Sequence, residues 1–262
     1  MRPLVALLTD FGTRDHYAGT MKGVIAGICP EAALIDVTHD VPAHDVAAAA
    51  LELAAAYKYF PAGTIFLVVV DPGVGSARRA IAAEAGDYRF VAPDNGVLGI
   101  VFRDVPPKKV VELTERRYAR PTVSRTFEGR DRFAPAAAWL ARGVQLTALG
   151  RPLTDWRPLD LPVAEVTPDA IRGTIVRVDR FGNLVTNIER RAVERLAQSG
   201  AVVIEAGGQA VGPLVATYAE LPADGVGALF GSSDHLELAA PSASAAARLG
   251  LDRGASVTVR RR

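Results

Sequence analysis

Short apolar runs alternate with amphipathic or alanine-rich stretches through the first half of the chain. The apolar runs predict strands at 3–9, 34–37, 65–70, 80–83, 89–91 and 109–113. The stretches between them predict helices, one built on Met21, Val24, Ile25 and Ile28, one capped by Asp45 and running to Tyr59, and one from Pro135 to Arg142. This alternation is typical of a mostly parallel sheet with helices on both faces.

The pattern changes near residue 150. Prolines recur between residues 151 and 168, which indicates an extended linker. Short β-type runs follow, separated by Gly- and Ser-rich turns, at 171–178, 184–188, 201–205, 236–238 and 256–259. The predicted fold class is therefore α/β. An N-terminal, mostly parallel α/β sandwich domain occupies 1–150, a proline-rich linker 151–168, and a small all-β barrel domain 169–262.

Composition narrows the class of protein. The chain has 262 residues, with 30 basic and 29 acidic side chains and a net charge of +1, which argues against a broad nucleic-acid surface. The single cysteine excludes an intramolecular disulfide and a cysteine-based zinc site. The run at 65–70 is far too short to span a bilayer, and the apolar start has no cleavage site. We expect a cytoplasmic protein without nucleic-acid or membrane partners.

Common cofactor motifs are missing from the sequence. No lysine follows a glycine, so a phosphate-binding Walker loop is excluded. The segment Gly73-Val74-Gly75 has no third glycine at the dinucleotide spacing, which argues against NAD. No two histidines stand at the helical spacing of metal ligands. We expect no cofactor.

Three aspartates share one context, because each comes just after an apolar strand. Asp10, Asp71 and Asp94 are each followed by glycine within two residues. In open parallel sheets ligands bind at the carboxyl ends of the strands, so the three side chains are expected to face one crevice. Any one of them alone would be ordinary turn chemistry. A carboxylate placed there suits a ribose diol or a divalent metal, and both alternatives stay open.

Further polar groups have two interpretations each. Arg78 could pair with Asp71 if buried, or lie in solvent. The charged segment 126–131 precedes a helix, where Asp131 could simply be a cap. Asn183 lies between two strands and could read a purine edge with its amide or hold the turn.

Together these segments resemble the S-adenosylmethionine (SAM) hydroxide adenosyltransferase family, also called SAM hydrolases. The family is related to enzymes that fluorinate or chlorinate the same substrate. The resemblance spans nearly the whole chain in order, and its segments are 8–12, 21–23, 70–79, 92–96, 126–135, 179–187 and 231–239. It implies an α/β domain, a β-barrel domain, and a homotrimer in which SAM lies between the α/β domain of one subunit and the barrel of the next.

The resemblance also implies roles for single residues. Asp10 would bind the ribose, and Asn183 and the chain near Ser242 would bind adenine. Asp15, Asp179 and Ser232 would bind the methionine end. Asp94 and Asn95 are also expected among the substrate-binding residues. The hydrolases are similar in using an Asp–Arg–His set to prepare water. Asp71 and Arg78 match its first two members, and Glu128 stands where the family has histidine.

The expected reaction is hydrolysis of SAM to adenosine and methionine by attack of activated water on the ribose C5′. Glu128 is the candidate base, and we expect it to ion-pair with Arg78. One alternative is a protein that binds SAM or adenosine with little or no turnover, since the histidine is replaced. A halogenase ranks lower because the extra negative charge of Glu128 should repel halide. A metal-dependent hydrolase using Asp10, Asp71 and Asp94 is the remaining alternative, although no metal is expected.

Overall fold

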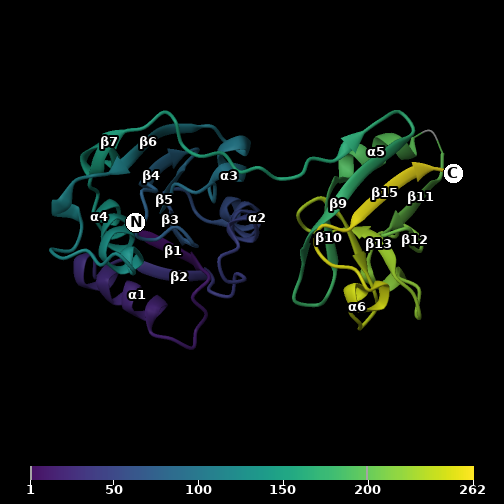
Figure 1. Ribbon diagram of the computed structural model, residues 1–262, viewed down its shortest axis with the longest axis horizontal. Helices are drawn as coiled ribbons and strands as arrows, with labels where there is room; N and C mark the ends of the chain where they lie inside the picture. The colour runs from purple at the N-terminus through teal and green to yellow at the C-terminus, as the bar shows by residue number, and fades with distance from the viewer. Residues whose placement is uncertain (1, 199) are drawn as a thin grey trace. The chain divides into compact units, whose positions relative to one another are not determined.

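The computed structural model describes residues 2–198 and 200–262, which form two compact units, one ending at Asp160 and the next beginning at Leu161 (Figure 1). The proline-rich segment predicted as a linker is divided between them. Strand β7 (Gly150–Pro152) pairs with a strand of the first unit, and β8 (Glu165–Val166) pairs with one of the second.

The sheet of the first unit has the strand order β2-β1-β3-β5-β4-β6-β7. The strands not yet given bounds are β1 (Leu4–Thr9), β2 (Ala33–Thr38), β3 (Ile65–Val69), β4 (Ala80–Ala85), β5 (Tyr88–Pro93) and β6 (Pro107–Leu113). The strands β2, β1, β3 and β5 run parallel, whereas the pairings of β4, β6 and β7 are antiparallel. Because β1, β3 and β5 are parallel neighbours, their carboxyl ends lie along one edge of the sheet.

Helices cover both faces of this sheet, as predicted (Figure 1). Their bounds are α1 (Tyr17–Ile28), α2 (Val46–Ala56), α3 (Gly99–Asp104) and α4 (Ala134–Ala141). Alternate residues of β1 point to opposite faces. Val5 and Leu7 pack with residues of α1 and α4, and Ala6 and Leu8 pack with residues of α2 and α3. The α/β class is confirmed.

The helix boundaries follow from local chemistry. The Asp45 carboxylate accepts the Ala48 N–H at 2.9 Å, which is the predicted N-cap of α2. Helix α1 ends at Ile28, immediately before Cys29 and Pro30, and begins four residues earlier than Met21, the first apolar position of the pattern. Helix α3 was not predicted, since six residues are too few to show a period.

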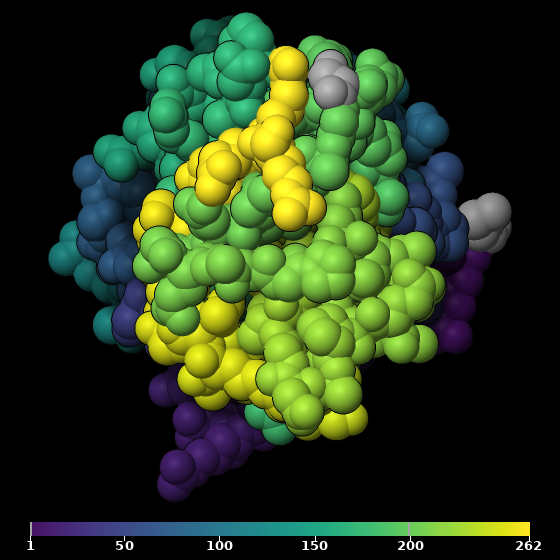
Figure 2. All heavy atoms as spheres, turned by 90° about the vertical axis from the view of Figure 1, so that its right-hand side faces the viewer, coloured from purple at the N-terminus to yellow at the C-terminus, as the bar shows by residue number. Residues whose placement is uncertain are grey.

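The second unit is built on an antiparallel sheet with the order β12-β11-β15-β9-β10-β14-β13. The bounds are β9 (Ala170–Val178), β10 (Leu184–Glu189), β11 (Val202–Ala206), β12 (Gln209–Ala210), β13 (Gly227–Phe230), β14 (His235–Ala239) and β15 (Ser256–Arg261). The path is open, so the sheet is a curled half-barrel. Figure 2 shows one face of this unit, formed by its green to yellow segments. The short helices α5 (Arg190–Ala197) and α6 (Ala245–Leu249) were not predicted.

Within the part of the chain that the structure describes, every helix is too short or too polar to cross a membrane.

Candidate active site

Asp10, Asp71 and Asp94 leave adjacent strands at the same edge of the sheet. Asp10 directly follows β1, Asp94 directly follows β5, and Asp71 is one residue beyond the position after β3. The parallel order β1-β3-β5 therefore places the three strand ends along one edge of the sheet, and that the three side chains face one crevice stays a prediction. The three carboxylates nevertheless have different partners.

Asp71 holds Arg78 through both carboxylate oxygens. Arg78 donates from Nε to Asp71 Oδ1 at 2.9 Å and from one terminal nitrogen to Oδ2 at 2.5 Å. The Asp71 side chain is 6% exposed and the Arg78 side chain 8% exposed. Such a bidentate, charge-assisted pair fixes the plane of the guanidinium as well as its position.

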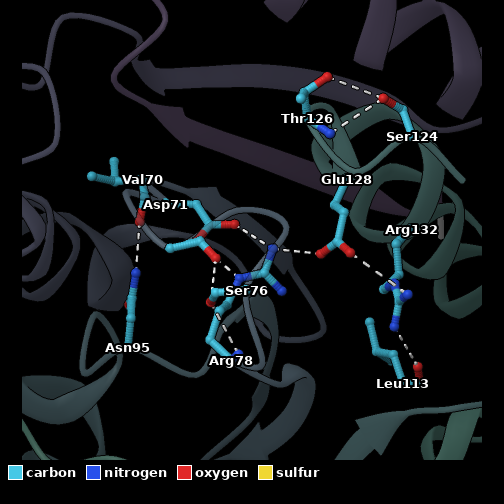
Figure 3. Close-up of polar contacts among 11 residues, drawn as sticks. Val70, Asp71, Ser76, Arg78, Asn95, Leu113, Ser124, Thr126, Glu128 and Arg132 are labelled. Carbon is cyan, nitrogen blue, oxygen red and sulfur yellow. Dashed lines mark hydrogen bonds and ion pairs between the residues drawn. The ribbon is translucent and has the colours of Figure 1, made fainter.

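Glu128 approaches the same guanidinium from the other side, as Figure 3 shows. Its Oε2 accepts from the Arg78 nitrogen that also binds Asp71, so the predicted ion pair is present. Its Oε1 lies 3.6 Å from a terminal nitrogen of Arg132. The Arg78 guanidinium also lies over the Phe133 ring, 5.2 Å from its centre. The formal charges of Asp71, Arg78, Glu128 and Arg132 sum to zero.

A π-helical turn places Glu128. The turn spans Gly129–Phe133 and continues into α4, and Glu128 is the residue just before it. Such turns are rare in proteins, and those that do occur are often found at functional sites. Asp131 is buried inside the turn, where it accepts the Ser124 N–H at 2.8 Å and pairs with Arg130. The reading of Asp131 as a helix cap is therefore wrong: its carboxylate fastens the preceding loop.

The glycine-rich turn that carries Asp71 and Arg78 packs on the segment leading to Glu128. Gly75 has φ +77°, and a Cβ there would lie 2.5 Å from the carbonyl oxygen of Arg125. Only glycine fits both the conformation and the space. The Ser76 hydroxyl donates to Gly73 O at 2.6 Å and accepts from the Arg78 N–H at 3.2 Å. The local turn thus positions the arginine.

Burial and charge shift the protonation of this cluster. Burial raises the pKa of Asp71 above its usual range, the bonds to Arg78 oppose the rise, and the charge of Glu128 adds to it. Burial alone would lower the pKa of Arg78, but its bonds to Asp71 and Glu128 raise the value, so the guanidinium remains charged. Two carboxylates that share one buried cation are a setting in which a proton can be taken up.

Asp94 and Asn95 make contacts that hold loops. Arg79 donates to Asp94 Oδ2 at 2.8 Å, and the Arg157 N–H donates to Oδ1 at 2.8 Å. The Asn95 amide donates to Val70 O at 2.8 Å and so ties the loop after β5 to the end of β3. These are the contacts of a turn, and substrate binding by the two residues stays a prediction.

Asp10 and Asp15 lie in the loop between β1 and α1. Asp10 Oδ2 accepts the His44 N–H at 2.8 Å and is half-buried. The same loop is held by the Gly12 N–H, which donates to His39 O at 2.7 Å. Asp15 is exposed. The structure therefore brings neither residue into the ion-pair cluster, and their binding roles stay predictions.

The site residues predicted in the second unit belong to its turns. Asp179 Oδ1 accepts the N–H groups of Phe181 and Asn183, at 2.9 and 2.8 Å, and Oδ2 accepts the Asn183 amide at 2.9 Å. The amide of Asn183 thus holds a turn, which is one of its two interpretations. Ser232 and Ser242 are exposed.

Two features escaped the sequence reading. Glu237 is buried in β14, where Tyr218 donates its hydroxyl to Oε2 at 3.0 Å, and burial raises the pKa of both groups, that of Tyr218 to about 12. A glutamate flanked by Leu236 and Leu238 in a strand was the available signal. The second feature is Arg132, whose spacing of four residues from Glu128 was the signal.

Among residues 2–198 and 200–262, no three histidine, cysteine, aspartate or glutamate side chains are grouped as metal ligands. Asp71 and Asp94, two of the three aspartates of the metal alternative, each pair with an arginine of their own.

Comparisons with known proteins identify the family of this chain. Residues 5–150 match the family described as SAM hydroxide adenosyltransferase N-terminal domain, and residues 173–258 match the corresponding C-terminal domain. The chain is 38% identical to a protein of Thermus thermophilus named (R)-S-adenosyl-L-methionine hydrolase, over 98% of this chain and 99% of the relative. It is 42% identical to a protein of the same name from Salinispora tropica, over 75% and 76% of the two chains.

A solved structure gives the same result for the fold. The crystal structure of an uncharacterized conserved protein from Thermotoga maritima superposes with a TM-score of 0.90 at 34% identity, covering 98% of this chain and all of that one. The two family matches follow one another along the chain, and the N-terminal match includes the buried Asp71–Arg78 pair. The chain belongs to the SAM hydroxide adenosyltransferase family.

Proposed function

We propose that this protein hydrolyses SAM to adenosine and L-methionine. The observation that carries the proposal is the buried cluster in which Asp71 and Glu128 grip Arg78 from two sides. Family membership supports the choice of substrate, since relatives that share 38% and 42% of their residues are named SAM hydrolases.

The reaction needs no catalytic group to assist departure of the leaving group. A water oxygen attacks the ribose C5′, the C5′–S bond breaks, and its electron pair stays on sulfur. Methionine leaves as a neutral thioether, so no general acid is needed. The water must lie in line with the C–S bond and must lose a proton. Because the sulfonium charge disappears during the step, a site shielded from water favours the transition state.

The cluster can supply what remains. Arg78, oriented by two bonds to Asp71, would stabilise the developing hydroxide. Glu128 is the proposed base and would accept the proton of the water. Arg132 balances the charge of Glu128, so the cluster stays neutral beside a cationic substrate. Halogenation ranks below hydrolysis, because a relative named SAM hydrolase is 38% identical to this chain and one named fluorinase is 28% identical.

The finer assignments from the resemblance are also proposals. They place the ribose at Asp10, adenine at Asn183 and near Ser242, and the methionine end at Asp15, Asp179 and Ser232, with Asp94 and Asn95 in the same set. They also include a homotrimer with sites at subunit interfaces, a cytoplasmic location, and no cofactor. Light scattering of the purified protein tests the trimer, and a mass of one or two chains would contradict it.

A second candidate function is SAM or adenosine binding without turnover. It is favoured by one contact pattern: both Glu128 oxygens face arginines, so both are engaged in ion pairs and neither is left free to accept the proton of a water. This candidate predicts tight binding and no product.

Chromatography of products after incubation with SAM distinguishes these functions. Parallel samples should contain chelator or halide, and a sample without protein corrects for spontaneous breakdown. Equal amounts of adenosine and methionine, unchanged by either addition, are expected. Bound but unconverted SAM would support the binding protein, loss of product with chelator the metal alternative, and a 5′-halogenated adenosine the halogenase.

A further inference from the structure

A cavity of the first unit lies beside the proposed active site and shares Arg132 with it. It has a volume of about 810 Å³ and is lined by the end of β6, the 3₁₀ turn Arg116–Tyr118, the loop that follows it and the start of α4. Ligand pockets for small organic molecules have volumes of this order. None of the residues predicted for the active site lines this cavity.

The cavity wall carries a surplus of positive charge. Of the described residues that line it, Arg116, Arg117, Arg120 and Arg132 are cationic and Glu115 is the one carboxylate. Arg116 and Arg117 have no carboxylate partner within the described residues, and Arg117 stacks on the Tyr118 ring at 4.8 Å. This concentration of charge contrasts with a net charge of +1 for the whole chain.

Arg132 joins this cavity to the catalytic cluster. Its terminal nitrogens make two long contacts, 3.4 Å to Leu113 O and 3.6 Å to Glu128 Oε1. Its Nε is buried and has no hydrogen-bond partner. The side chain is 34% exposed, so part of the guanidinium is accessible. A buried, unsatisfied donor on a loosely held guanidinium indicates a group that can turn toward another acceptor.

We propose that this arginine-lined cavity is an anion site for a phosphate monoester. Arginine suits phosphate because its planar fork matches two oxygens at once. The volume exceeds that of a phosphate group alone, and Leu113, Tyr118 and Leu149 add apolar wall, so a monoester with an apolar body fits better than the free ion.

Occupancy of the site would act on catalysis through Arg132, and this part rests on the proposed function. An anion that attracts Arg132 removes one of the two arginine partners of Glu128 and leaves Arg78 as the other. Asp71, Arg78 and Glu128 then carry a net charge of minus one, and the position of Glu128 is less constrained. Phosphate monoesters should therefore lower the rate of SAM hydrolysis without competing with SAM.

Calorimetric titration tests the site without reference to turnover. The probes are inorganic phosphate and phenyl phosphate, at constant ionic strength set with chloride. We expect saturable binding of both, tighter for phenyl phosphate, and a loss of about tenfold or more in the double variant Arg116→Ser/Arg117→Ser. The matched control is Arg103→Ser/Lys109→Ser, which removes two exposed charges that do not line the cavity.

The possible outcomes distinguish anion binding in the cavity from its effect on SAM hydrolysis. Absence of saturable binding, or equal weakening in the control variant, would overturn the anion site. Equal affinity for the two probes would overturn the monoester and leave an inorganic anion. Binding that leaves the hydrolysis rate unchanged would overturn the link through Arg132. If no SAM is turned over at all, the proposed function fails, and the titration still decides the site.

Discussion

Replacing Glu128 by glutamine tests the proposed base with little change of shape. Arg78 keeps both bonds to Asp71 in this variant, so the group that would stabilise hydroxide stays in place. Loss of a general base costs about 10²- to 10⁴-fold in rate. We therefore expect kcat for SAM hydrolysis to fall by this factor while KM changes little.

The same substitution should leave the fold nearly as stable. The glutamine oxygen can still accept from Arg78, and Arg132, the partner of the other oxygen, is partly exposed. Exchanging a charged acceptor for a neutral one should cost about 1 kcal/mol of unfolding free energy. Glu84→Gln is a matched control, because Glu84 pairs at 3.5 Å with the exposed Arg89 away from the cluster.

The substitution also changes how stability depends on pH. The pKa of Asp71 is raised in the folded state by burial and by the charge of Glu128. Its contribution to stability is complete below the unfolded-state pKa of about 3.9 and is lost as pH rises through the higher folded-state value. Removing the Glu128 charge reduces the rise, so Glu128→Gln should lose less stability than the parent as pH rises from about 4 through the folded-state pKa of Asp71. Urea unfolding at each pH measures this difference.

Product chromatography with Glu128→Gln, Glu128→His and Glu84→Gln completes the test. Histidine at this position should preserve or raise turnover, since imidazole is the better base near neutral pH. Full turnover in Glu128→Gln would refute Glu128 as the base. A large loss in Glu128→His would refute the idea that glutamate merely replaces the histidine of the family.

Three other predictions concern the charges around this site and in the second unit. Arg78→Met should lower the unfolding free energy by about 3–5 kcal/mol, because two buried carboxylates lose their cation. Arg79→Met should lower it less, since the Arg79 side chain is 26% exposed, and urea unfolding of both variants measures the difference. Arg132→Gln should lower kcat/KM by about two- to fivefold, the value of a partly exposed ion pair, and Arg132→Lys should retain most activity; equal rates in all three proteins would contradict it. In a tyrosinate absorbance titration one group should titrate near pH 12 and be absent in Tyr218→Phe, because burial and Glu237 raise the pKa of Tyr218 to about 12. The stability that this group adds is complete below the unfolded-state pKa of about 10 and is lost as pH rises from there through about 12.

Much of the fold could be predicted from the spacing of apolar residues, because the buried strands and helices show that spacing clearly. The run at 65–70 became β3, the central strand between β1 and β5, and the Asp45 cap began α2 as expected. The elements that were missed are short, such as α3 and β12, where too few residues exist to show a period. Periodicity also does not report direction, so the antiparallel addition of β4, β6 and β7 needed the structure.

The candidate site was predictable where its residues share one turn. Asp71 and Arg78 stand on one glycine-rich loop, so the sequence could suggest their pairing, and the structure decides against the alternative of a solvated arginine. Glu128 came into the set through the resemblance, because fifty residues separate it from Arg78 and only the packed sheet and α4 bring them into contact. Contacts of that kind depend on tertiary structure and have no local signature.

Arg132 shows why the remainder of the site needed the fold. A glutamate and an arginine four residues apart are usually a solvated pair on a helix face. Here Glu128 stands just before the π-helical turn and Arg132 within it, and Glu128 contacts both Arg132 and the buried Arg78, so the same spacing becomes part of the charge balance. Without that arginine, Asp71 and Glu128 would share the single cation Arg78, and the buried cluster would carry a net charge of minus one, which is costly. Glu128 and Arg132 therefore act as one unit, and the effect of changing either residue depends on the presence of the other.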